Sequence, residues 1–144
     1  MSQKCKNKLS EGFNMILCLG ALLGFISVAF GAYAEHALRE TITEEHFRFL
    51  MTAVRYNQVH AVAVIAVGLV ELANVQPTRF ALARWSGMLF ILGTVLFSFS
   101  IYASVTFKLP ALVNITPAGG ITIMGGWLML ALFGYRTMST KHVH

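Results

Sequence analysis

Stretches without a charged residue alternate with short polar segments along this chain, and they predict its main elements. A helix needs roughly 20 residues to cross about 30 Å of hydrocarbon. Three charge-free stretches reach that length, residues 12–34, 85–107 and 109–135. A fourth stretch, between Arg55 and Glu71, has only 15 uncharged residues, so a helix there spans the membrane if an end charge snorkels or the helix continues past the lipid. We therefore expect four spans.

The segment between the first two spans carries helical signals of its own. Thr41, with Glu44 three residues later, has the form of a capping box, and Thr43 is a competing N-cap. From there onward apolar side chains recur at helical spacing, at Phe47, Leu50, Met51 and Val54. The pattern predicts an amphipathic outer-face helix that leads directly into the second span.

The last span also has a start signal, because Thr116 can cap a helix and Pro117 fits its first turn. Together these elements predict an all-α fold, an integral membrane four-helix bundle. The chain divides into a basic cytoplasmic N-terminus (residues 1–12), a single four-span transmembrane domain (residues 13–135) and a cytoplasmic C-terminal tail (residues 136–144).

Composition supports a membrane protein. Apolar residues make up 56% of the 144 positions and charged residues only 12%, and the mean hydropathy is +0.66. Soluble domains carry about 25% charged residues, and a soluble fold of this size could not hide so much apolar surface. The net charge of +5 comes from scattered cations, so the lipid bilayer is the expected partner and nucleic acid is not.

Lysines and arginines are distributed unevenly between the two sides of the predicted bundle. One side has seven, Lys4, Lys6, Lys8, Arg79, Arg84, Arg136 and Lys141. The other side has four, Arg39, Arg48, Arg55 and Lys108. By the positive-inside rule both termini are expected to be cytoplasmic. Residues 32–34 resemble a signal-peptide cleavage site, but the long apolar run before them and the three further spans favour a retained first span.

Small residues form a stripe on each predicted span. On the first span Gly20, Gly24, Ser27 and Gly31 fall within about 40° of one another. The other helix-packing candidates are Gly68 on the second span, Gly87 on the third, and Gly119 and Gly126 on the fourth. Small residues allow close backbone packing in lipid, which favours a compact bundle. A polar translocation path would use the same stripes and stays open as the alternative.

Three strings have a familiar order and spacing. They are GAYAEHAL (31–38), TAVRYNQVHA (52–61), and LGTVLFSFSIY (92–102) followed by TPAGGITIMGGW (116–127). In this arrangement the chain resembles the YgdD/YwdK family of small inner-membrane proteins, which carry a domain of unknown function. The resemblance covers about residues 20–135. It implies four transmembrane helices in a bacterial inner (plasma) membrane, and it implies no established activity.

The residues that match the family's pattern include His36, Tyr56, His60, Ser98, Ser100, Tyr102, Gly119, Gly120 and Trp127. Three positions depart from it. Glu35 stands where the family has a small residue, Asn57 where it has a glutamine, and Phe99 where it has a glycine between two serines. A role for that amide, or for close packing at that glycine, does not carry over to this chain.

Polar residues near the outer ends of the spans form the candidate site. The candidate outer-leaflet cluster consists of Glu35, His36, Tyr56, Asn57, His60 and Tyr102. Burial disfavours a charged imidazolium, so His60 is expected to be neutral and bonded to Glu35, Tyr33 or Tyr102, which would tie the first three spans together. Glu35, His36 and His60 could supply three metal ligands. No local spacing such as HxxxH supports such a site, so neither a metal nor a cofactor is expected.

Two further residues have simpler interpretations. Glu71 lies near the cytoplasmic end of the second span, where Arg79 or Arg84 across the short loop is the expected ion-pair partner. Trp127 lies in the middle of its span and is expected to pack inside the bundle.

The sequence shows no set of nucleophile, base and orienting group, so no catalytic residue and no enzyme activity are expected. The leading interpretation is a non-catalytic accessory or assembly component, with a larger membrane complex or a homo-oligomer as partner. The alternative is a small transporter, or a proton- or metal-handling membrane protein that uses Glu35, His36 and His60.

Overall fold

The computed structural model describes residues 3–73 and 81–139, with side chains described for residues 15–73 and 81–137. Its helices are α1 (Gln3–Tyr33), α2 (Glu44–Ala73), α3 (Ala81–Thr94), α4 (Ser100–Thr106) and α5 (Thr116–Ser139). A π-helical turn, Val95–Phe99, joins α3 to α4 in one continuous rod, and another, Ala34–Leu38, follows α1. Four rods are thus long and apolar enough to cross a membrane, which confirms the all-α, four-span prediction.

The second span is long enough because its helix continues past the lipid. At 1.5 Å per residue, the 30 residues of α2 extend for about 45 Å. That length exceeds the roughly 30 Å of hydrocarbon in a bilayer. The span is therefore not limited to the 15 residues between Arg55 and Glu71.

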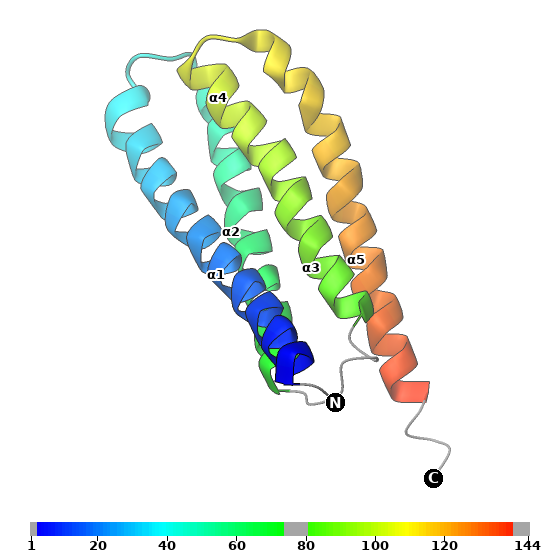
Figure 1. Ribbon diagram of the computed structural model, residues 1–144. Helices are drawn as coiled ribbons and strands as arrows, with labels where there is room; N and C mark the ends of the chain where they lie inside the picture. Colours follow the sequence, from blue (N-terminus) through cyan, green and yellow to red (C-terminus); the bar gives the residue numbers. More distant parts are fainter. Residues whose placement is uncertain (1–2, 74–80, 140–144) are drawn as a thin grey trace.

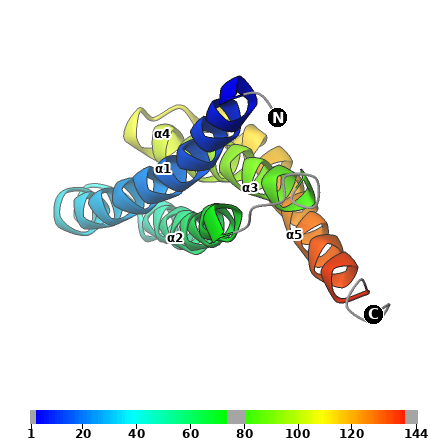
Figure 2. The same cartoon turned by 60° about the horizontal axis from the view of Figure 1, so that its bottom comes forward.

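The four rods form two antiparallel pairs. α1 packs mainly on α2, α5 packs mainly on α3, and the two pairs meet where α2 packs on α3 (Figures 1 and 2). The N-terminal end of α1 and the C-terminal end of α5 lie at the same end of the bundle (Figure 1). Arg79 and Lys141, which contribute to the predicted orientation, lie outside the described residues.

Thr43 is the cap of α2. The backbone N–H of His46 donates to Thr43 Oγ1 at 3.3 Å, so this competing cap is confirmed. The capping box at Thr41 is wrong, because the hydroxyl of Thr41 donates instead to the carbonyl of Leu38 at 2.9 Å. The first turns of α2 are amphipathic as predicted: Leu50 and Val54 are buried, and Glu44, Glu45 and Arg48 are exposed.

The last helix starts differently from the prediction. A 3₁₀ segment, Pro110–Ile115, runs directly into α5, so the backbone of Thr116 is already helical (φ −53°, ψ −43°) and its N–H donates to the carbonyl of Val113. Its hydroxyl lies 3.0 Å from the hydroxyl of Ser100 on α4. Thr116 is therefore not an N-cap. The preceding 3₁₀ turn leaves it no free helix start to cap, and its side chain links two helices.

Glycines set how closely α1 approaches α2. A Cβ added to Gly20 would lie 2.9 Å from Val64 Cγ1, and one added to Gly68 would lie 3.1 Å from the backbone nitrogen of Leu17. A Cβ added to Gly24 would lie 3.8 Å from the Cβ of Ala61, which is an ordinary van der Waals contact. The tightest part of this interface is therefore at Gly20 and Gly68. Gly31 and Ser27 also lie in it: a Cβ on the former would be 3.3 Å from Val54 Cγ1, and the latter is fully buried.

The α3–α5 interface is tighter still. A Cβ added to Gly119 would lie 2.5 Å from the backbone nitrogen of Phe97, and one added to Gly126 would lie 2.8 Å from the ring of Phe90. Gly93 was not among the sequence candidates, yet a Cβ there would lie 2.7 Å from Ile123. Gly87 serves the α2–α3 contact, because its Cβ would lie 3.1 Å from Val67 Cγ1.

Candidate functional site

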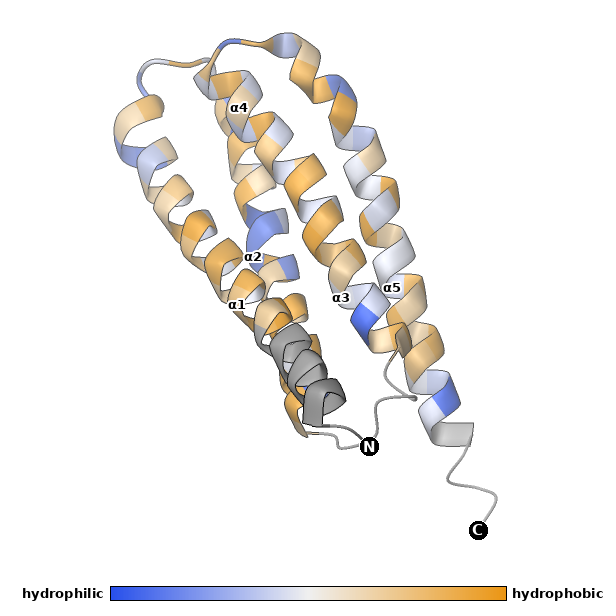
Figure 3. Ribbon diagram, in the orientation of Figure 1, coloured by the Kyte–Doolittle hydropathy of each residue, from blue (hydrophilic) through white to orange (hydrophobic). Residues whose placement is uncertain are grey.

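A hydrophilic stretch interrupts the otherwise apolar surface of α2 near its middle (Figure 3). Its sequence is Arg-Tyr-Asn-Gln-Val-His, residues 55–60. Asn57 and His60 turn inward and are buried, whereas Arg55 and Tyr56 are exposed. Polar side chains at membrane depth are costly unless other groups of the protein satisfy them. The partners of this stretch therefore decide what it can do.

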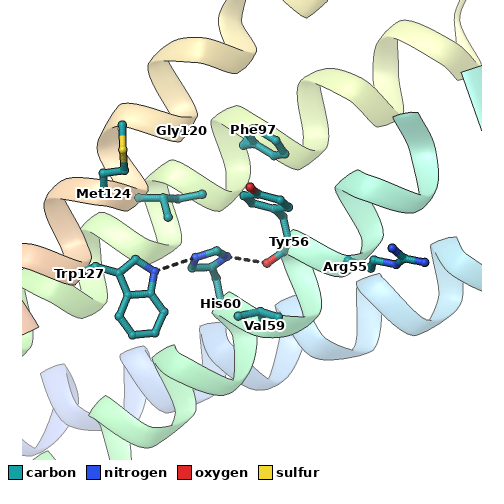
Figure 4. A pocket seen from close by; sticks show the side chains of 9 residues that line it. Arg55, Tyr56, Val59, His60, Phe97, Gly120, Met124 and Trp127 are labelled. Carbon is teal, nitrogen blue, oxygen red and sulfur yellow. Dashed lines mark hydrogen bonds between the residues drawn. The ribbon is translucent and has the colours of Figure 1, made fainter. Parts of the chain in front are cut away.

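His60 uses both of its ring nitrogens within the fold. Nδ1 lies 2.6 Å from the carbonyl oxygen of Tyr56, and Nε2 lies 3.2 Å from Nε1 of Trp127 on α5 (Figure 4). A carbonyl oxygen can only accept and an indole N–H can only donate. The proton of His60 is therefore on Nδ1, and the ring is the neutral tautomer that accepts at Nε2.

Aromatic rings enclose this hydrogen-bonded pair. The ring centroid of Phe90 lies 5.6 Å from that of His60 and 4.9 Å from that of Trp127. Tyr56 stacks on Phe97 with centroids 4.4 Å apart. The cluster thus joins three elements, α2, the α3 rod and α5, through contacts between rings as well as through a hydrogen bond.

A second set of contacts holds α2 to the α3–α4 rod. Asn57 Nδ2 donates to the hydroxyl of Tyr102 at 3.4 Å, and Ser98 Oγ donates to the carbonyl of Ala53 at 2.9 Å. The ring of Tyr102 stacks on Phe30 of α1, with centroids 3.9 Å apart. The predicted tie between the first three spans therefore exists, but Asn57 and Tyr102 make it and His60 does not.

The predicted partners of His60 are wrong. Glu35 pairs with Arg39 one turn further along, and both side chains are largely exposed, as is His36. Because α1 and α2 are antiparallel, with Gly31 against Val54 and Gly24 against Ala61, Glu35 lies level with about residue 50 of α2. That is ten residues from His60, or about 15 Å along the helix axis. Glu35 and His36 thus lie outside the cluster around His60.

His60 also has no bond to Tyr33 or Tyr102, and its partner is a residue of the fourth span, Trp127. The tryptophan is partly inside the bundle, since its N–H reaches His60 and its ring packs on Phe90, although 45% of its surface stays exposed. Among the described residues, no three histidine, cysteine, aspartate or glutamate side chains lie close enough to hold a metal ion.

Glu71 is more deeply buried than its predicted place at an interface implies. It is 1% exposed, and within the described part of the chain neither of its carboxylate oxygens has a hydrogen-bond partner. Arg84, one of the two expected partners, makes no direct ion pair with Glu71, although its charge acts on the carboxylate. Glu71 shares the inward face of α2 with Val64 and Gly68. Arg79, the other expected partner, lies outside the described residues.

A groove opens between α2 and α5 beside this cluster, with a volume of about 590 Å³. Its floor is Phe97 of the π-helical turn, and its walls come from the two helices (Figure 4). The lining side chains are mostly apolar or aromatic, and Arg55 is the charged one among them. The lining residues are Arg55, Tyr56, Val59, His60, Phe97, Gly120, Ile123, Met124 and Trp127.

Comparison with known proteins gives a consistent result. The family described as "Protein of unknown function (DUF423)" matches residues 30–120. A "UPF0382 membrane protein" of Haemophilus influenzae is 34% identical over 88% of this chain and 98% of its own length. The "UPF0382 inner membrane protein YgdD" of Escherichia coli is 29% identical over 84% of this chain and 89% of its own length. No solved structure matches the chain.

Proposed function

The chain belongs to the DUF423 family of membrane proteins, and on that premise we propose that it is a non-catalytic accessory or assembly component of a larger complex in the bacterial inner membrane. The relatives compared above are UPF0382 membrane proteins, one of them named an inner membrane protein, and their names state no activity. The proposal therefore depends on the geometry of the site.

The observation that carries the proposal is the double hydrogen bonding of His60. Both ring nitrogens are engaged inside the protein, one with the carbonyl of Tyr56 and one with the indole of Trp127. Because its two partners are a backbone carbonyl of α2 and the indole of α5, the ring of His60 links these two helices, which is a structural role.

Large apolar side chains are exposed on three of the described spans. Phe25 on α1 is 71% exposed, Val62 on α2 is 66% exposed, and Leu128 on α5 is 68% exposed. Such side chains face lipid or another membrane-spanning helix. A protein with such exposed apolar side chains on three spans can act by association with another membrane-spanning helix.

Photo-cross-linking tests the proposal in native membranes. A photoreactive phenylalanine analogue is placed separately at Phe25, Val62 and Leu128, each on a different helix. We expect one of these positions to give a single protein adduct of fixed mass, which then co-purifies in constant stoichiometry in two mild detergents. An adduct of twice the chain mass would identify a second copy of this chain as the partner.

Lipid adducts alone at all three positions would contradict an accessory role. The alternative, a small transporter or a proton- or metal-handling protein, needs Glu35, His36 and His60 to converge, and the antiparallel register of α1 and α2 holds the first two away from the third. Counter-ion-dependent flux in proteoliposomes, or metal found by elemental analysis of the purified protein, would favour that alternative.

Both termini are proposed to be cytoplasmic. The described ends of α1 and α5 lie at the same end of the bundle (Figure 1), as four spans require. The excess of lysine and arginine that the sequence predicts for that side supports a cytoplasmic location by the positive-inside rule.

A further inference from the structure

The groove between α2 and α5 has a charged end and an apolar end. Ser98 of the rod that forms its floor bonds to the carbonyl of Ala53, so Phe97 lies at the level of Arg55. At the other end His60 bonds to Trp127. Arg55 is nearer the start of α2 and marks the end of the groove away from the chain termini, and the apolar lining extends towards the middle of the bundle. Its side chain is exposed, and the guanidinium points away from Tyr56 and His60 (Figure 4).

Arg55 has no counter-ion in the described part of the chain. Its side chain is exposed and lies 11 residues, about 16 Å, beyond the first residue of α2. An arginine in a membrane-spanning helix is costly unless it reaches the interface or is paired with an anion. Arg55, the one cation among the lining residues, therefore favours a ligand with a negatively charged group at the outer end of the groove.

We propose that this groove binds an anionic phospholipid of the surrounding membrane, with the headgroup phosphate on Arg55 and one acyl chain in the groove towards Trp127. A guanidinium offers parallel N–H donors that fit phosphate oxygens. Val59, Ile123 and Met124 then provide apolar contact for the chain. The site does not depend on the accessory role proposed above, and either can fail without the other.

The dimensions of the groove fit one lipid chain and not a helix. Between Gly120 and Trp127 the α5 wall is seven residues long, or about 10 Å. A partner helix would need a seam along much of the roughly 30 Å of hydrocarbon. A volume of about 590 Å³ with mostly apolar walls and one charged group is typical of sites for amphiphilic small molecules.

Tryptophan quenching by brominated lipids provides the test. The chain has two tryptophans, so Trp85→Phe leaves Trp127 in the groove as the single reporter. The protein is reconstituted in phosphatidylcholine vesicles that contain either brominated phosphatidylglycerol or brominated phosphatidylcholine. We expect an apparent affinity about five-fold higher for the anionic lipid, the equivalent of about 1 kcal/mol for one cation near the membrane surface.

Exposed charges provide the matched pair of variants. Arg55→Gln should bring the ratio of the two affinities to about one. Arg48→Gln removes an exposed cation two turns earlier, on the same side of α2 but outside the groove, and should leave the ratio unchanged. Equal quenching by both lipids in the parent, or a ratio that survives Arg55→Gln, would overturn the proposal.

Two glycines provide a second matched pair. A Cβ at Gly120 would lie 4.0 Å from the ring of Phe97, and a Cβ at Gly125 would lie 3.9 Å from Leu89, so both sites accept a Cβ at ordinary contact distance. Gly120→Leu fills the groove and should reduce quenching by the anionic lipid. Gly125→Leu lies outside the groove and should not. Unchanged quenching in Gly120→Leu would show that no chain occupies the groove and would also overturn the proposal.

Discussion

Gly93 of α3 and Gly119 of α5 face each other directly. A Cβ built on Gly93 would lie 3.0 Å from the carbonyl oxygen of Gly119, and a Cβ built on Gly119 would lie 2.9 Å from the carbonyl oxygen of Gly93. Neither position has room for a side chain unless the helices separate. This contact determines how closely the second helix pair of the bundle packs.

Gly119→Ala is expected to destabilise the protein. The new methyl group would lie 2.5 Å from the backbone nitrogen of Phe97, so the helices must move apart. Overpacking of this kind costs about 1–3 kcal/mol, which should appear as a lower melting temperature in detergent. Gly134→Ala is the control on the same helix, because a Cβ there meets nothing within 4 Å. Equal melting temperatures for the two variants would show that the contact does not limit packing.

The bond between His60 and Trp127 should appear as coupling in a double-mutant cycle. His60→Leu leaves the indole N–H of Trp127 without an acceptor, and Trp127→Phe removes that donor. Hydrogen bonds between membrane helices average about 0.6 kcal/mol, with a maximum near 1.7 kcal/mol, so we expect a coupling energy in that range. His60→Asn, which can still accept, should be milder than His60→Leu. Strictly additive unfolding energies would contradict the bond.

The same geometry predicts the tautomer of His60. With Nδ1 donating to Tyr56 and Nε2 accepting from Trp127, the proton resides on Nδ1. Nitrogen NMR of histidine-labelled protein should show one ring with an unprotonated, hydrogen-bonded Nε2, and Trp127→Phe should shift that resonance alone. A ring protonated at Nε2 in the folded protein would exclude the arrangement.

The small-residue stripe of α1 should be sensitive to bulk, most of all at its tightest point. Gly20→Leu places a side chain at a position where an added Cβ alone would lie 3.0 Å from the backbone nitrogen of Ile65. Gly31→Leu should be destabilising too, and Gly24→Leu less so, because its nearest neighbour is 3.8 Å away. Leu22→Ala, at a side chain 51% exposed, is the control and should change the melting temperature least. The reverse order would place the helix interface on another face of α1.

Reporter fusions test the threading. With both termini in the cytoplasm, a reporter that is active only there should work when fused to the C-terminus. The same reporter inserted at Glu45, in the first turn of α2, should be inactive. Activity at Glu45 would contradict the proposed orientation.

The sequence alone was sufficient for the elements that each depend on one helix. Backbone groups in lipid must be satisfied within their own segment, so charge-free runs of sufficient length predict the spans. The amphipathic start of α2 and its cap at Thr43 follow from side chains within a few residues of each other. The glycine stripe of α1 is likewise a property of a single helix, and it lies against α2 as expected for such a stripe.

The choice of which helices supply partners to one another depends on the packed bundle and could not be predicted from the chain. The face of His60 could be predicted from its spacing, but its partner depends on the rotation and register of a helix 67 residues away in the chain. For the same reason Glu35 was assigned to a cluster that the register of α1 against α2 excludes, and Gly93 was missed although it faces Gly119. Periodicity within one helix determines which side chains share a face, whereas the fit between side chains of different helices determines what that face meets.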